Sequence, residues 1–246
     1  LALSAPFDID TKALHVSKYL KAFENGTIDD LYGGVNGGPK DVIFVLDDSG
    51  SMSGGRLETC KKCMREDIIK TRLQSEDRAG MLFLNATQLE VPLGQCNDSH
   101  VGRLQASVSS VRATGGTPLW EYILKAVNTL SGLGDNKRSK WIVALTDGQA
   151  NLSVLTTVYN SLRTGQGQNV RVLFITVDLA GEYEKTIRDT IIRGDADTLI
   201  RANGGSAHLE KAWADVGDRL TVSQKIEEHG EDIATSECER LLRKYM

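Results

Sequence analysis

The sequence predicts an α/β fold in which a doubly wound, mostly parallel sheet has one antiparallel edge strand and helices on both faces. Short, wholly apolar runs such as residues 42–46 are typical of strands buried on both faces of a parallel sheet. The segments between these runs carry apolar residues at intervals of three and four, which is typical of helices. Strands that alternate with helices favour parallel pairs joined by right-handed crossovers.

After the strand at residues 42–46, we expect a helix and then a pair of strands. The helix over residues 56–73 is indicated by apolar side chains at helical spacing, namely Leu57, Cys60, Met64 and Ile68. Residues 78–84 and 88–93 have strand-like patterns joined by the short turn Asn85-Ala86. Such a pair is antiparallel, and we therefore place it at an edge of the sheet.

The rest of the chain repeats the alternation. Residues 101–111 and 119–130 have helical spacing, and Pro118 suits the first turn of the second helix. Residues 141–145 form another wholly apolar run, and we expect a buried strand there. The remaining expected helices are at 152–162, 183–193 and 209–220, and the remaining strands are at 171–177 and 198–201.

We divide the chain into three parts. Residues 39–221 form the main domain, because segments of chemical interest spread along it must share one core. Residues 1–38 are an N-terminal extension that contains a helix within residues 8–31 and a glycine-rich hinge at 33–38, and residues 222–246 are a C-terminal helical tail. The chain begins Leu-Ala-Leu-Ser rather than with Met, which indicates part of a larger polypeptide or a processed form.

Composition excludes two classes of partner. Among 246 residues the net charge is −4, so that no nucleic-acid surface is indicated. The longest apolar runs have the length of strands, and we therefore expect no membrane insertion by this chain.

Asp47, Ser49 and Ser51 place one carboxylate and two hydroxyls at alternate positions directly after the first strand. In open α/β sheets, ligands bind beyond the carboxyl ends of the strands. Ligation by oxygen alone suits Mg²⁺ or Mn²⁺ better than Zn²⁺, which prefers nitrogen and sulfur. These three residues therefore predict a site for a hard divalent metal.

Two later segments add oxygen ligands. Thr117 lies in the glycine-rich segment 113–119, and Asp147 follows the strand at 141–145 and precedes Gly148. The combination of Asp-x-Ser-x-Ser, a loop Thr and an Asp before Gly resembles a von Willebrand factor A-type domain with a complete metal-ion-dependent adhesion site. The resemblance covers about residues 39–220 and implies the fold described above.

The resemblance also implies a ligand set and a mode of binding. Asp47, Ser49, Ser51, Thr117 and Asp147 would hold Mg²⁺ or Mn²⁺, with Ca²⁺ as an open alternative, either directly or through water. An Asp or Glu side chain of a protein partner would complete the shell. Asp48 is outside the matching positions, and we interpret it as a solvated carboxylate or as a support for the ligands.

We therefore predict a metal-dependent, adhesion-type protein-binding module without enzymatic activity. The alternatives are a scaffolding domain of a larger intracellular assembly and, third, a metal-assisted hydrolase. Ser51 has no Gly-x-Ser-x-Gly context and no histidine nearby in sequence, so nucleophilic catalysis lacks a visible base. Residues 33–40 are a near miss to a phosphate loop, with Pro39 at the lysine position, and we interpret them as a linker.

The compartment stays open. Cys60 and Cys63 resemble half of a zinc or redox motif, but no second such pair exists, and we expect buried free thiols, which favours the cytoplasm. Four Asn-x-Ser/Thr sequons, at Asn25, Asn85, Asn97 and Asn151, would matter only in an extracellular protein.

Overall fold

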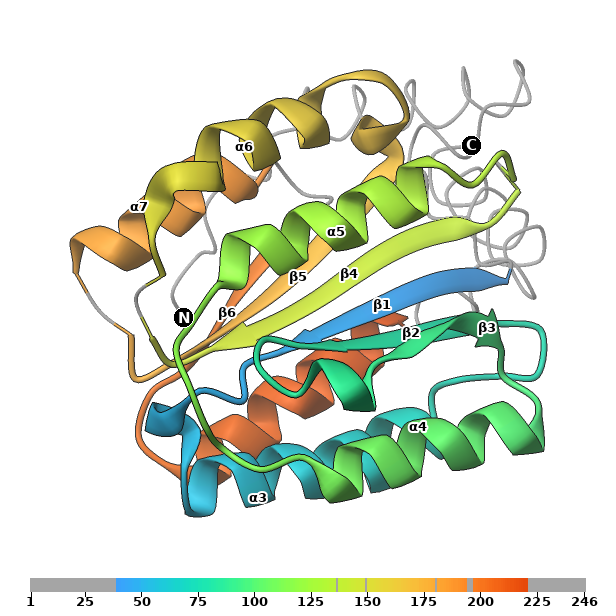
Figure 1. Ribbon diagram of the computed structural model, residues 1–246, viewed down its shortest axis with the longest axis horizontal. Helices are drawn as coiled ribbons and strands as arrows, with labels where there is room; N and C mark the ends of the chain where they lie inside the picture. The colour runs from blue at the N-terminus through green and yellow to red at the C-terminus, as the bar shows by residue number, and fades with distance from the viewer. Residues whose placement is uncertain (1–38, 136, 149, 180, 194–196, 221–246) are drawn as a thin grey trace, which may run out of the picture. The chain divides into compact units, whose positions relative to one another are not determined.

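The computed structural model describes residues 39–135, 137–148, 150–179, 181–193 and 197–220. Within them, six strands form one sheet in the order β3-β2-β1-β4-β5-β6. The strands are β1 (Lys40–Leu46), β2 (Arg78–Phe83), β3 (Val91–Gln95), β4 (Ser139–Thr146), β5 (Val170–Val177) and β6 (Thr198–Ala202). All neighbouring pairs are parallel except β2 with β3. The predicted fold class is therefore confirmed (Figure 1).

Helices cover both faces of this sheet (Figure 1). The longer ones are α3 (Gly55–Lys62), α4 (Asp98–Ser110), α5 (Leu119–Ser131), α6 (Leu155–Arg163) and α7 (Glu182–Ile191), and residues 206–220 are also helical. The short helical segments are η1 (Gly50–Met52), the π-helical η2 (Cys63–Ile69), η3 (Thr87–Leu89), η4 (Leu152–Val154) and η5 (Gly165–Asn169). The helix expected over residues 56–73 runs through α3 and η2. Within the described part of the chain, no helix is both long and apolar enough to cross a membrane.

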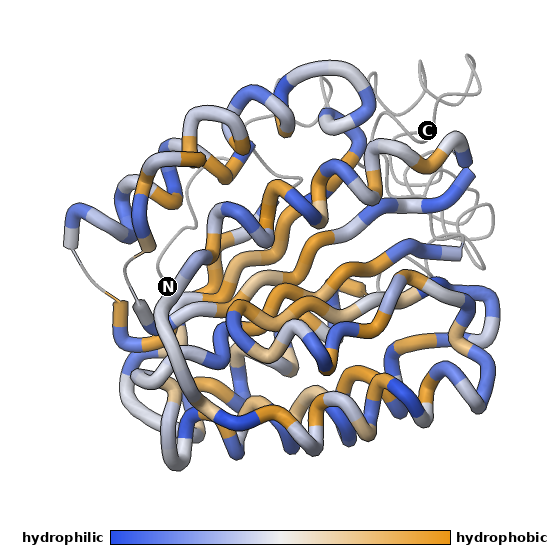
Figure 2. Tube along the Cα trace, viewed as in Figure 1, coloured by the Kyte–Doolittle hydropathy of each residue, from blue (hydrophilic) through white to orange (hydrophobic). Residues whose placement is uncertain are grey.

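Two hydrophobic cores lie on the two faces of the sheet. Phe44 and Leu46 of β1 belong to the core formed with α3, α4 and the helix at 206–220. Ile43 and Val45 alternate with them and belong to the core formed with α5, α6 and α7. Figure 2 shows the hydrophobic residues concentrated along the strands between the two layers of helices. The uninterrupted apolar sequence of β1 follows from this double burial.

The predicted edge strand is displaced along the chain. We expected a strand at residues 88–93, but η3 occupies the first of these positions and β3 begins at Val91. The reason lies in Asp48, whose carboxylate accepts hydrogen bonds from the backbone N–H groups of Asn85 and Ala86, each at 2.8 Å. These two bonds hold the connection in a fixed loop, so that it is longer than a two-residue turn.

Ion pairs lie at the amino ends of the parallel strands. The buried Lys40 ammonium lies 2.6 Å from the buried Asp77 carboxylate. Asp41, also buried, is paired with Arg78 at 2.6 Å and with Arg138 at 2.7 Å. Lys40 thus has a structural partner within the domain.

Cys60, Cys63 and Cys96 are buried and free, as expected. Burial raises the pKa of the Cys60 and Cys63 thiols to about 12 and that of Cys96 to about 11. A thiol with such a pKa is a poor nucleophile and a poor metal ligand at neutral pH. The fourth cysteine, the N-terminal extension with its hinge and the C-terminal tail lie outside the described residues.

Candidate functional site

The candidate site lies where the parallel strands β1 and β4 end. The two strands are in register through Leu46 and Leu145, and the residues that follow them therefore leave the sheet side by side. The backbone N–H of Asp47 continues the pairing by donating to the Leu145 carbonyl at 3.1 Å. Asp47 directly follows β1, and Asp147 directly follows β4. Both residues are thereby brought to the same end of the parallel strands.

A chain of polar side chains connects the two strand ends. The hydroxyl oxygens of Ser49 and Ser51 are 3.0 Å apart, and the Ser51 hydroxyl donates to Oδ1 of Asp147 at 2.6 Å. The Ser49 N–H donates to Oδ1 of Asp47 at 2.9 Å, and the Thr146 hydroxyl donates to Oδ2 at 2.5 Å. Four of the five predicted ligands therefore form one hydrogen-bonded cluster.

Thr117, the fifth predicted ligand, lies against the same cluster. A β-carbon built on Gly148 would come within 3.1 Å of the Thr117 hydroxyl oxygen, so that the glycine after Asp147 leaves just enough room for this side chain. The Gly50 N–H donates to the Gly115 carbonyl at 3.2 Å, which joins η1 to the glycine-rich segment. The structure thus brings all five side chains to one edge of the sheet.

Asp48 is buried and binds the surrounding loops. Of its two interpretations, that of a solvated carboxylate was therefore wrong, and that of a supporting residue agrees with these contacts. Besides the two N–H groups described above, its carboxylate accepts from the Asn85 side-chain amide at 3.3 Å. The same amide donates to the Gly116 carbonyl at 2.9 Å, and the Asp48 carbonyl accepts from the Thr114 N–H at 2.7 Å. Asp48 therefore positions the segment that carries Thr117.

Sequence reasoning missed Arg56. Its guanidinium donates to Oδ2 of Asp147 and to Oδ2 of Asp178, each at 2.8 Å. The Asp147 side chain is fully buried, whereas 39% of the Arg56 side chain and 35% of the Asp178 side chain are exposed. A basic residue just inside the helix that follows Asp-x-Ser-x-Ser was the available signal, but its partners are 91 and 122 residues away in the chain.

Asp178 links Arg56 to a further segment. It follows β5 with a positive φ of 49°, a conformation that Asp tolerates better than most residues. Its Oδ1 accepts the N–H of Gly204 at 2.9 Å, shortly before the helix at 206–220. Hydrogen bonds from the Gly204 N–H and from Arg56 outweigh the effect of burial and lower the pKa of this carboxyl group.

The electrostatics of the cluster favour a cation. Burial raises the pKa of Asp47, and the nearby Asp147 charge adds to this, although hydrogen bonds from Ser49 and Thr146 act in the opposite direction. Partial burial lowers the pKa of Arg56, but Asp178 and Asp147 together more than compensate and raise it. Two carboxylates in a partly dry environment are stabilised by positive charge.

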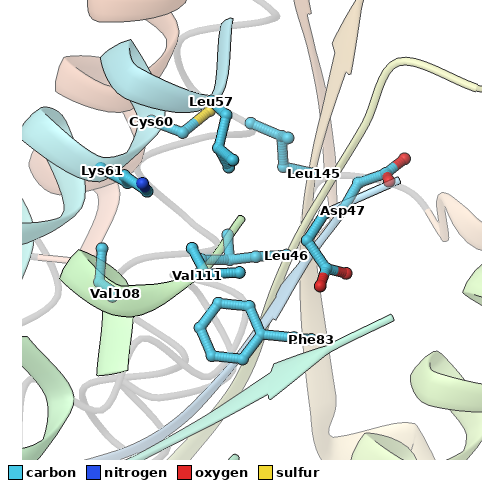
Figure 3. A pocket seen from close by; sticks show the side chains of 10 residues that line it. Leu46, Asp47, Leu57, Cys60, Lys61, Phe83, Val108, Val111 and Leu145 are labelled. Carbon is cyan, nitrogen blue, oxygen red and sulfur yellow. The ribbon is translucent and has the colours of Figure 1, made fainter. Parts of the chain in front are cut away.

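A small cavity of about 10 Å³ lies beneath the cluster, with room for about one water molecule. Its lining is mostly apolar and comes from the strand ends, α3 and α4, with Leu57, Phe83, Val108 and Leu145 around it (Figure 3). A cavity of this size and polarity takes no organic ligand. The candidate site is therefore the polar cluster itself.

The donor set is chemically suited to Mg²⁺ or Mn²⁺. All its functional atoms are oxygens, which come from two carboxylates and three hydroxyls, and none is nitrogen or sulfur. Among the described residues, no group of three or more His, Cys, Asp or Glu side chains could hold an ion. A metal at this edge would therefore depend on the hydroxyl groups in addition to Asp47 and Asp147.

Comparison with known proteins agrees with the fold. Residues 42–149 match the model of the von Willebrand factor type A domain. Inter-alpha-trypsin inhibitor heavy chain H4 of Homo sapiens is 30% identical over 48% of this chain, and E3 ubiquitin-protein ligase WAV3 of Arabidopsis thaliana is 29% identical over 52%. The chain covers only 12% and 17% of the length of these two proteins.

Solved structures show the same architecture. The pilus adhesin SpaC from Lactobacillus rhamnosus GG has a TM-score of 0.59 at 14% identity, over 74% of this chain and 30% of SpaC. The SpRpn10 VWA domain has a TM-score of 0.57 at 14% identity, over 76% of this chain and 98% of that one. Residues 42–149 are thus similar in sequence to a von Willebrand factor A-type (VWA) domain, and the sheet has the fold of these solved structures.

Proposed function

We propose that this VWA domain is a divalent-metal-dependent protein-binding module of the adhesion type. Asp47, Ser49, Ser51, Thr117 and Asp147 would hold one Mg²⁺ or Mn²⁺ ion, with Ca²⁺ as an alternative, and an Asp or Glu of a partner would complete its shell. The observation that carries the proposal is the single cluster that these side chains form at the ends of β1 and β4.

Charge supports an acidic partner. The two carboxylates would balance the formal charge of a divalent ion, and the three neutral hydroxyls would add no charge. Mg²⁺ usually retains water at part of its octahedron. The chemistry that a bound ion supplies is an electrophilic position at the surface. A partner carboxylate is favoured there because Coulomb attraction is stronger in a partly dry cleft than in bulk water.

The similar proteins support a role in binding. SpaC is a pilus adhesin, and the tip protein Mfa5 of a Porphyromonas gingivalis pilus contains a domain of similar fold, with a TM-score of 0.56 at 11% identity. WAV3 is named as a ubiquitin ligase, but the matching region is 17% of that protein. In the present chain, His100 and His208, the described histidines, bind the backbone oxygens of Ala79 and Gly204 rather than a serine of the site. We therefore propose no catalytic role for this domain.

A scaffolding domain that binds its partner without metal is the second candidate. One observation favours it: Arg56 already places a cation on Asp147, and the site can therefore be held together without an ion. The two candidates differ in their response to chelation. A metal-dependent module loses its partner in EDTA, whereas a scaffold retains it.

The test is calorimetric titration of Mg²⁺ and Mn²⁺ into the wild-type chain and two variants. Asp47→Asn removes a charge and preserves shape, and we expect it to abolish binding of the ion. Asp189→Asn, which changes an exposed carboxylate on α7, should bind the ion as the wild type does. Equal affinities for all three proteins would remove the basis of the site.

A further inference from the structure

Arg56 already neutralises Asp147, one of the two carboxylates proposed to hold the ion. Both oxygens of that buried carboxylate are in use, since Oδ1 accepts from Ser51 and Oδ2 accepts from Arg56. The Arg56–Asp147 bond is 2.8 Å long and joins a partly exposed guanidinium to a side chain without exposed surface. The domain therefore contains its own counterion at the candidate metal site.

We propose that Arg56 is a resident competitor of the metal, so that the strength of ion uptake is set by how firmly Arg56 holds Asp147. This inference rests on the proposed function, because it concerns the same ion. An ion that shares Asp147 meets a guanidinium attached to the same carboxylate, and like charges at such a distance repel strongly in a partly dry site. Uptake is then favoured when Arg56 moves away from Asp147.

Asp178 provides the alternative partner that such a movement requires. It already accepts one arm of the guanidinium at 2.8 Å, and 35% of its side chain is exposed. The Gly204 N–H fixes Asp178 from the other side at 2.9 Å. Arg56 can therefore release Asp147 while its charge stays paired with Asp178. The free-energy cost of this movement is lower than that of leaving the guanidinium without a counterion.

A purely structural ion pair is the alternative explanation, and it predicts a different result. If Arg56 merely orients Asp147 for the metal, its removal weakens ion binding. If Arg56 competes, its removal strengthens ion binding while the metal-free protein becomes less stable, because Asp147 is then buried without a counterion. Affinity and metal-free stability thus move in opposite directions only under competition.

The experiment compares the wild-type chain with Arg56→Gln, Arg56→Lys and the control Arg188→Gln. The control removes an exposed guanidinium of α7 from Glu184, which keeps Arg201 as a partner. Mn²⁺ is titrated by calorimetry, and thermal unfolding is recorded in EDTA. We expect Arg56→Gln to bind Mn²⁺ about tenfold more tightly, which corresponds to about 1.4 kcal/mol, and to melt earlier in EDTA. Arg56→Lys keeps the charge without the two-armed geometry, and it should bind more tightly than the wild type but less tightly than Arg56→Gln.

The outcomes separate this inference from the proposed function. Mn²⁺ binding by Arg56→Gln and by none of the other proteins would support competition in its strongest form. Equal or weaker binding by Arg56→Gln than by the wild type would overturn competition and leave the metal site intact. Should Arg56→Gln fail to fold, the same comparison is made with Arg56→Lys, for which equal or weaker binding overturns competition. Absence of Mn²⁺ binding in every protein would refute the proposed function and competition together.

Discussion

Replacing Asp48 by Asn should destabilise the domain and loosen the segment that carries Thr117. The carboxylate is buried and accepts two backbone N–H groups at 2.8 Å, one on each oxygen. An amide preserves the shape, but its NH₂ group must face one of these two donors. One charge-assisted bond is lost, and a buried N–H is left unpaired, which together cost about 2–3 kcal/mol.

Urea unfolding of Asp48→Asn against the surface control Asp189→Asn measures this cost. We expect the midpoint to fall at an unchanged slope, and for a domain of this size the melting temperature should fall by about 5–10 °C. Because Asn85 connects Asp48 to Gly116, ion affinity should fall as well. A free energy of unfolding within 0.5 kcal/mol of the control, as an order-of-magnitude threshold for neutral surface changes, would refute the assigned role of Asp48.

Three further changes test the loop, the thiols and the rim of the site. Gly115→Ala should lower the free energy of unfolding in urea by about 2 kcal/mol or more, because φ is +71° and the added carbon would lie 2.2 Å from the Asn85 side-chain oxygen. An unchanged free energy of unfolding would contradict this loop geometry. Peptide mass spectrometry after alkylation at pH 8 should find Cys60 and Cys63 unmodified in the folded protein and modified in urea, since pKa values of about 12 leave almost no thiolate. Rapid labelling of the folded state would contradict the burial of these thiols. Thr117→Ala should weaken chelator-sensitive partner binding in a pull-down assay, whereas Thr117→Ser keeps the hydroxyl and should retain it; equal retention by both would favour the scaffold.

The sheet and its helices could be predicted because double burial leaves a direct record in the sequence. The runs at 42–46 and 141–145 are wholly apolar since every residue in them faces one of two cores. The edge strand was misplaced because its starting point is set by hydrogen bonds from Asn85 and Ala86 to Asp48. Those bonds join residues 37 and 38 positions apart, and no local pattern records them.

The candidate site could be predicted only in part from the sequence. Carboxylates and hydroxyls at strand ends could be recognised because parallel strands bring their carboxyl ends to one edge. Arg56 and Asp178 could not, since their pairing depends on where α3 begins relative to the end of β5. Asp178 also follows its strand without a flanking Gly or hydroxyl pattern, and nothing in its sequence distinguishes it from a surface carboxylate.

The Lys40–Asp77 pair has a practical consequence for producing this domain. Lys40 is the first residue of β1, and both its ammonium and its backbone N–H bind the buried Asp77 carboxylate. A recombinant fragment that starts after residue 40 would leave that carboxylate buried without its counterion, at a cost of about 3–5 kcal/mol. Expression trials should therefore start upstream of Lys40, and a truncation series across this position would show soluble yield falling abruptly when that lysine is lost.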